Sequence, residues 1–158
     1  MTNSSDQNPQ HTGDPLLTKI EERLRRGNYL KEDDRPLQRI LEEDATEVTR
    51  LEMNLDEITD KMKQLYDEGR KGFGDPIVVD DTYEVIVRED RGILASPWIG
   101  DQFPAPKAIV EAINLKNGKK IKYSILGWYL IRTHGFFQGK GSPFRVEPAD
   151  LHDFFLTQ

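Results

Sequence analysis

The clearest hydrophobic pattern in the chain lies between Pro36 and Gly69. Apolar residues recur there at alternating spacings of four and three, and Asp44 is the one polar residue in this register. No glycine or proline interrupts the segment, so the pattern predicts one coiled-coil-like helix of about 33 residues, about 50 Å long. The apolar residues that we expect to form its contact seam are Leu41, Val48, Leu51, Leu55, Ile58, Met62 and Leu65.

A strict repeat of this length is typical of a left-handed seam between helices, and it is longer than a small neighbouring domain can cover. We therefore expect the seam to bind a second copy of the chain or another protein. The alternative is that it packs within its own domain, against a shorter helix predicted over residues 15–26. Asp44 is costly in a seam, and it marks the register or the end of the contact.

The rest of the chain predicts a mixture of strands and helices after a glycine-rich boundary at residues 69–74. The spacings first predict strands at 77–79 and 82–87, a turn at 89–92 and a return strand at 93–96. They then predict a helix over 106–117, a strand at 119–123 and a helix over 125–134. A glycine-tipped hairpin within 136–146 and a terminal helix from 147 are predicted to complete the chain.

The order of helix, short strand, helix and hairpin within residues 106–146 is similar to a winged-helix module. The resemblance implies that residues 124–134 form the recognition helix and that Gly139–Gly141 form the tip of the wing. Residues 125–131 are mostly apolar, however, which is typical of a buried helix rather than one that reads a DNA groove. The predicted fold class is α+β. It comprises a disordered tail (1–13), a helical hairpin with the long coiled-coil-like helix (14–69) and a small, possibly winged-helix-like α+β domain (75–158).

Charge is segregated along the chain, although the net charge is only −6. Residues 107–145 hold eight lysines and arginines and a single glutamate, a net of +7, with aromatic residues among them. A compact basic surface of this kind binds phosphate groups or an acidic protein. The residues that we expect to contact a nucleic acid are Lys116, Lys119, Lys120, Lys122, Lys140 and Arg145.

Catalytic and cofactor-binding motifs are not evident. The absence of cysteine excludes disulfides and thiolate chemistry, and the three histidines show no metal-ligand spacing. Gly139-Lys140-Gly141-Ser142 lacks the spacing of a phosphate-binding loop and is predicted to be a hairpin tip. We therefore expect no catalytic residue, cofactor or metal site, and no enzyme.

No stretch approaches the roughly 20 apolar residues of a membrane-spanning helix, and the first residues lack a secretory signal. These features predict a cytoplasmic protein with no membrane contact. We expect a non-enzymatic assembly or adaptor protein that forms homo-oligomers, or binds a protein partner, through the heptad helix. The alternative is a dimeric nucleic-acid-binding regulator that uses the basic segment 107–145.

Overall fold

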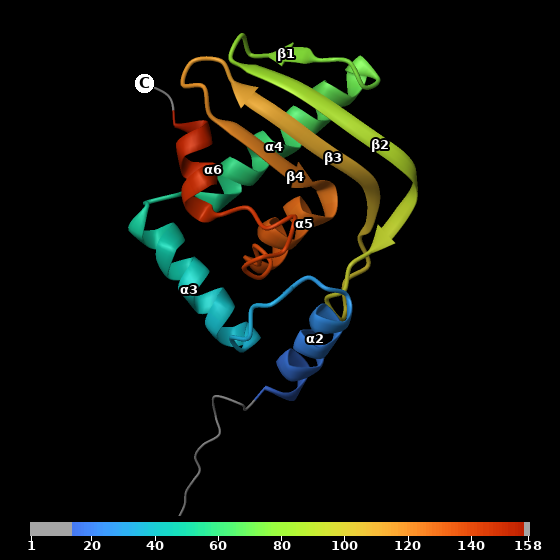
Figure 1. Cartoon of the computed structure of the whole chain (residues 1–158), viewed down its shortest axis with the longest axis vertical. Coiled ribbons are helices and arrows are strands. Elements are labelled where there is room, and N and C mark those ends of the chain that lie inside the picture. Colours follow the sequence, from blue (N-terminus) through green and yellow to red (C-terminus); the bar gives the residue numbers. More distant parts are fainter. Residues whose placement is uncertain (1–13, 157–158) are drawn as a thin grey trace, which may run out of the picture.

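A four-stranded antiparallel sheet forms one side of the fold (Figure 1). The computed structural model describes residues 14–156, so the predicted tail over 1–13 lies outside the described residues. The strands follow one another in the order β1 (Ile77–Val79), β2 (Tyr83–Ala95), β3 (Pro104–Asn114) and β4 (Lys120–Ser124). The helices are α2 (Pro15–Arg26), α3 (Leu37–Arg50), α4 (Leu55–Gly69), α5 (Ile125–His134) and α6 (Pro148–Phe155), with a 3₁₀ turn, η2 (Arg70–Gly72). The predicted α+β class is confirmed.

Side chains alternate between the two faces of this sheet. Val85 on β2 lies in register with Ala112 on β3, and Ala112 lies in register with Ile121 on β4. All three are buried in one hydrophobic cluster with Met62 and Leu65 of α4. The opposite face is open across the four strands (Figure 1). The sheet therefore has one face covered by helices and one face exposed to solvent.

Helix α4 is fixed to the covered face by hydrogen bonds as well as by apolar packing. The Tyr123 hydroxyl donates to the Met62 carbonyl at 2.7 Å, and the Trp128 indole N–H donates to the Thr59 carbonyl at 2.8 Å. Burial raises the pKa of Tyr123 well above its usual value, so this hydroxyl stays a donor. Both bonds join α4 to residues more than sixty positions later in the chain.

The prediction of one long helix from Pro36 to Gly69 is wrong. The segment forms two helices, α3 and α4, separated by residues 51–54, where Glu52 has a left-handed backbone (φ 55°). Asn54 begins α4, and its side chain accepts a hydrogen bond from the Glu57 N–H at 3.1 Å. The break lets α4 pack on the sheet while α3 packs in a second cluster, two directions that one straight helix cannot serve.

The second hydrophobic cluster joins the N-terminal helices to α5. Leu24 of α2 and Ile40 of α3 are buried there against Leu126, Leu130 and Phe136. Asp14 caps α2 and Ser124 caps α5, as their positions in the sequence predict. The two clusters contain residues from both sides of the boundary at 69–75. Whether the regions 14–69 and 75–158 are separate folding units stays a prediction.

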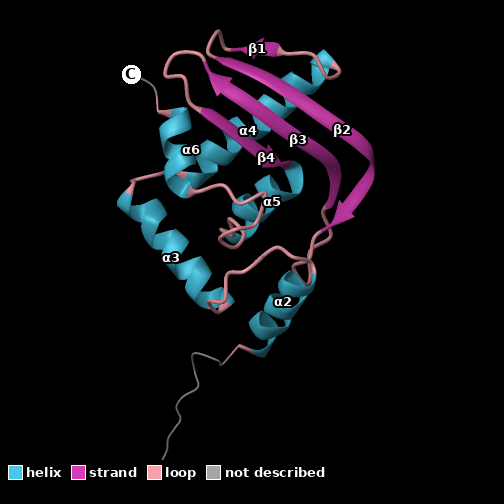
Figure 2. Ribbon diagram, viewed as in Figure 1, coloured by secondary structure: helices cyan, strands magenta, loops and turns pink. Residues whose placement is uncertain are grey.

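The predicted return strand at 93–96 and the predicted helix over 106–117 are both wrong. Strand β2 continues without a turn to Ala95, with a shift in register between Glu89 and Ile93, and it pairs with β3 as far as Pro104. Strand β3 occupies residues 104–114 because its alternate residues are buried on the covered face of the sheet. Figure 2 shows β2 and β3 extending beyond β1 and β4 towards α2.

The predicted hairpin within residues 136–146 is also wrong, because this segment forms a loop without a strand. The loop packs closely on the connection between α2 and α3. The Gly139 N–H donates to the Tyr29 carbonyl at 2.9 Å, and a Cβ at Gly139 would lie 2.4 Å from the Leu30 carbonyl oxygen. Without a wing, and with a strand in place of the helix over 106–117, the element order departs from the winged-helix pattern.

Candidate functional surfaces

The open face of the sheet is the first candidate surface. Val78 on β1 is 56% exposed, and Ile86, Ile109 and Ile113 are half-buried. Charged side chains lie between these apolar ones. We name as the open sheet face the side chains that point away from the helices: Val78, Glu84, Ile86, Arg88, Ile109, Glu111, Ile113, Lys120 and Lys122.

Charges on the open sheet face are arranged in rows across the strands. Glu111 accepts a hydrogen bond from Arg88 at 2.6 Å and lies 3.9 Å from the Lys122 ammonium. In the next row, Glu84 on β2 and Lys120 on β4 flank Ile113 on β3. Neither Glu84 nor Lys120 has an ion-pair partner among residues 14–156. The open sheet face thus carries one carboxylate, Glu84, and one ammonium group, Lys120, that form no ion pair with residues 14–156.

Four of the predicted nucleic-acid contacts lie close together. Lys116 and Lys119 lie in the turn between β3 and β4, and Lys120 and Lys122 lie on β4; all four are exposed. Asn114 shapes the turn, since its side-chain oxygen accepts from the Lys116 N–H at 2.9 Å. We call these four residues the lysine turn.

Lys140 and Arg145 lie elsewhere, in the loop over residues 136–146. Lys140 is exposed, and its main-chain N–H donates to the Asp33 carboxylate at 2.9 Å. The prediction that Arg145 contacts a nucleic acid conflicts with its place in the fold, because its side chain is only 5% exposed. Its guanidinium donates to Asp44, to Glu147 and to the Gln138 carbonyl. Burial alone would lower the pKa of Arg145, but the hydrogen bonds to Asp44 and Glu147 raise it above the usual value.

The predicted contact seam faces the chain's own core. Ile58, Met62 and Leu65 are buried against the sheet, and Val48 and Leu55 pack at the edge of the same cluster. These members therefore pack within the chain, but on the sheet and not against the helix over residues 15–26. Leu41 is half-buried beside the second cluster, and Leu51 is half-buried at the break between α3 and α4.

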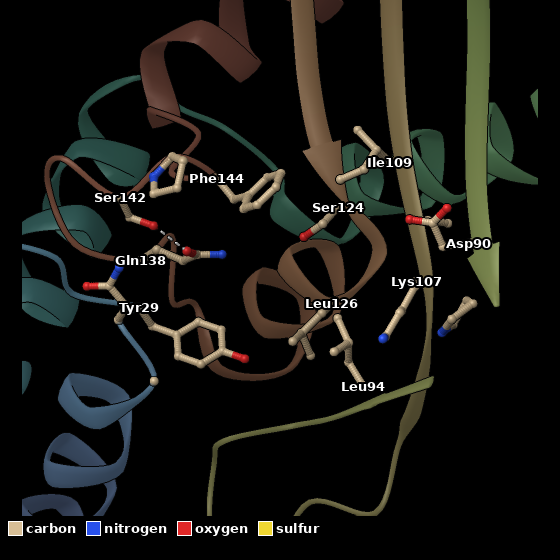
Figure 3. Close-up of a pocket in the computed structure, with 15 residues that line it drawn as sticks. Tyr29, Asp90, Leu94, Lys107, Ile109, Ser124, Leu126, Gln138, Ser142 and Phe144 are labelled. Atoms are coloured by element: carbon tan, nitrogen blue, oxygen red, sulfur yellow. Dashed lines mark hydrogen bonds between the residues drawn. The ribbon is translucent and has the colours of Figure 1, made fainter. Parts of the chain in front are cut away.

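A cavity of about 380 Å³ lies between α2, the extension of β2 and β3, α5 and the loop over 138–144 (Figure 3). Leu94, Leu126 and Phe144 supply apolar walls. Figure 3 shows the Tyr29 hydroxyl and the Lys107 ammonium directed towards the space between these walls. Burial raises the pKa of Tyr29, so its hydroxyl is a neutral donor at physiological pH. Nothing in the local sequence marks this cavity, because its walls come from segments far apart in the chain.

Among residues 14–156, Ser96, Asp101 and His134 form the one cluster that resembles a catalytic arrangement in composition. The Ser96 hydroxyl and the His134 imidazole both bond to the same Asp101 oxygen, at 2.7 and 2.8 Å. A nucleophile and its base must bond to each other, which these two do not do. His134 also stacks on Trp98 with ring centroids 4.1 Å apart. The cluster holds the loop over 96–103 on α5.

Within the described residues, no group of three or more His, Asp and Glu side chains is placed to hold a metal ion, and no helix is long and apolar enough to cross a membrane. Comparisons with protein-family models, with curated proteins and with solved structures gave no match. Function is therefore inferred from the surfaces themselves.

Proposed function

We propose that the protein is a non-enzymatic assembly module that associates with a second copy of itself through the open sheet face. The observation that supports this most is the one-sided covering of the sheet. Ile86 and Ile113 lie near the middle of an uncovered face, in a hollow shared by β2, β3 and β4. Pairing two such faces removes apolar side chains from water, as in proteins built from two stacked sheets.

The two charges of this face that have no ion-pair partner among residues 14–156 match those of a second copy. Glu84 and Lys120 lie in one row, on the strands that flank β3 from opposite sides. A twofold axis along β3, between two facing sheets, sets β4 of one copy over β2 of the other. Lys120 of each copy then lies opposite Glu84 of its partner. The pairing is self-complementary, and it replaces the heptad seam, whose central residues are buried in the core.

Sedimentation over a series of protein concentrations tests this proposal. We expect the wild type to form a dimer, and we expect Glu84→Lys and Lys120→Glu to raise the dimer dissociation constant about tenfold or more, because each places like charges opposite each other. The double variant Glu84→Lys/Lys120→Glu exchanges the two charges and restores the dimer. The matched control is Glu22→Lys, a reversal on the exposed side of α2.

A wild type that remains monomeric at every concentration overturns the proposal. Single variants that dimerise as tightly as the wild type also overturn it, because the open sheet face then does not form the contact.

The second candidate function is nucleic-acid binding, which the grouping of the lysine turn favours. Four exposed ammonium groups on one turn and one strand can contact neighbouring phosphates. Tyr123, Phe136 and Phe137 of the same basic segment are buried in the core, and the exposed Phe144 lies at the cavity, so they offer no stacking surface at the lysine turn. Binding through the lysine turn would therefore depend on charge and show little sequence preference.

A further inference from the structure

Gln138 is held in an unusual way beside the cavity. Its side chain is buried (4% of the residue is exposed), and its backbone lies in the left-handed region, with φ at 74°. Arg145 donates to its main-chain carbonyl at 2.6 Å, and the Ser142 hydroxyl donates to its side-chain oxygen at 2.7 Å. A non-glycine residue rarely adopts this strained conformation, so the surrounding bonds must impose it.

The amide nitrogen of Gln138 is left without an acceptor among residues 14–156. Because Ser142 binds the side-chain oxygen, Nε2 points to the other side, into the cavity (Figure 3). Leaving a buried amide without a hydrogen bond is unfavourable. An acceptor that enters the cavity therefore finds a donor that is already oriented.

Three further donors face the same space. The Tyr29 hydroxyl and the Lys107 ammonium point into it, and the Ser124 hydroxyl lies on its wall (Figure 3). The Ser124 oxygen accepts from the Gly127 N–H at 2.9 Å, which leaves its own proton free to be donated. Asp90, also on the lining, is the single carboxylate there. The donors thus favour a ligand with one negatively charged group that accepts hydrogen bonds. The Asp90 carboxylate opposes a second negative charge on the same ligand.

We propose that this cavity binds a small molecule with an apolar body and a single carboxylate. Its volume, about 380 Å³, lies in the range of small-molecule sites, about 300–1,000 Å³. The carboxylate accepts from Gln138 Nε2 and the Tyr29 hydroxyl, and the Lys107 ammonium, on the opposite side of the space in Figure 3, supplies positive charge. The apolar body packs on Leu94 and Phe144. The cavity shares one lining residue, Ile109, with the open sheet face, while its proposed donors lie outside that face, so it binds its ligand in a monomer as well.

Calorimetry with matched probes tests the charge preference. The probes are 1-naphthylacetate, its neutral amide 1-naphthylacetamide, and the cation 1-naphthylethylamine. We expect the wild type to bind the carboxylate about tenfold or more tightly than the amide, and to bind the cation most weakly, because a hydrogen bond to a charged group contributes about 1.5–3 kcal/mol. Lys107→Met removes an exposed charge and should abolish the difference between acid and amide. The matched control Lys116→Met should keep it.

NMR of the full chain locates the ligand. The side-chain amide signals of Gln138, identified by their loss in Gln138→Leu, should shift on addition of 1-naphthylacetate. The Glu84→Lys variant should give the same shift and the same affinity, since Glu84 does not line the cavity. Absence of binding at millimolar probe, equal binding of acid and amide, or shifts confined to residues outside the cavity would each overturn the proposal.

Discussion

Asp44 and Arg145 bind each other across 101 positions of the chain. Two nitrogen atoms of the guanidinium donate to the two carboxylate oxygens, at 2.8 and 3.0 Å, and both side chains are less than a tenth exposed. Asp44 is the one polar residue in the apolar stripe, and Arg145 is one of the cations of the basic segment. The ion pair therefore accounts for both the polar residue in the stripe and the burial of Arg145, and it holds α3 onto the C-terminal part of the chain.

The first prediction concerns this ion pair. Asp44→Ala should lower the free energy of unfolding by about 3–5 kcal/mol, because the buried guanidinium loses its main partner. Denaturant unfolding measures the change, with Asp34→Ala, at an exposed aspartate without an ion pair among the described residues, as the control. A loss below about 1 kcal/mol, the level of exposed pairs, would show that the pair does not hold α3 in place.

The second prediction concerns the lysine turn. If its four lysines contact phosphates of duplex DNA, the logarithm of the binding constant should fall against the logarithm of salt concentration with a slope of about −3.6. Lys119→Ala/Lys120→Ala should reduce the slope by about 2, since two contacts are lost. Lys140→Ala should leave it unchanged, because Lys140 lies in the loop beside α2. Titration by fluorescence anisotropy at several salt concentrations measures the slope, and lack of binding even at low salt would exclude this second function.

The third prediction concerns pH. The hydrogen bonds from the Arg35 side chain, aided by the Lys140 main-chain N–H, hold the pKa of Asp33 well below its usual value against the opposing effect of burial. The folded state therefore binds this proton more weakly than the unfolded chain, in which the aspartate pKa is about 3.9. The resulting stability, about 2–3 kcal/mol, is fully present above about pH 5, begins to fall as the pH drops below 3.9, and is lost completely only below the pKa of the folded state.

Denaturant unfolding of the wild type and Asp33→Asn at several pH values checks the pH prediction. The stability difference between the two should shrink as the solution is acidified from pH 6 to about pH 3. A difference that stays constant over this range would mean that the Asp33 pKa is the same in the folded and unfolded states.

Local signals in the sequence predicted the elements that have a cap or a clear end. Asp14 and Ser124 both precede helices that form as expected. The prediction of a helix that includes residues 106–114 is wrong because the apolar residues there fit a helix or a buried strand equally well. Only pairing with β2 decides between the two. The break at Asn54 had a signal that was missed, a capping residue three positions before Glu57.

The candidate surfaces were less predictable than the elements. The lysine turn follows from the sequence, since its residues are neighbours in the chain. The open sheet face does not, because it requires the strand assignment of 104–114 and the register of three strands. The cavity requires Tyr29 and Gln138 to lie beside each other on its wall. Their positions depend on the close approach of Gly139, the next residue after Gln138, to Tyr29 and Leu30.

The packing of α2 and α3 on later residues has a consequence for synthesis of the protein. These helices leave the ribosome first, yet Leu126, Leu130 and Phe136, which cover them, are made about a hundred residues later. Until then Leu24 and Ile40 have no core to enter, and such exposed apolar surface is what chaperones bind. The N-terminal helices therefore dock only after residue 136 has been made, and a ribosome stalled before that residue holds them uncovered.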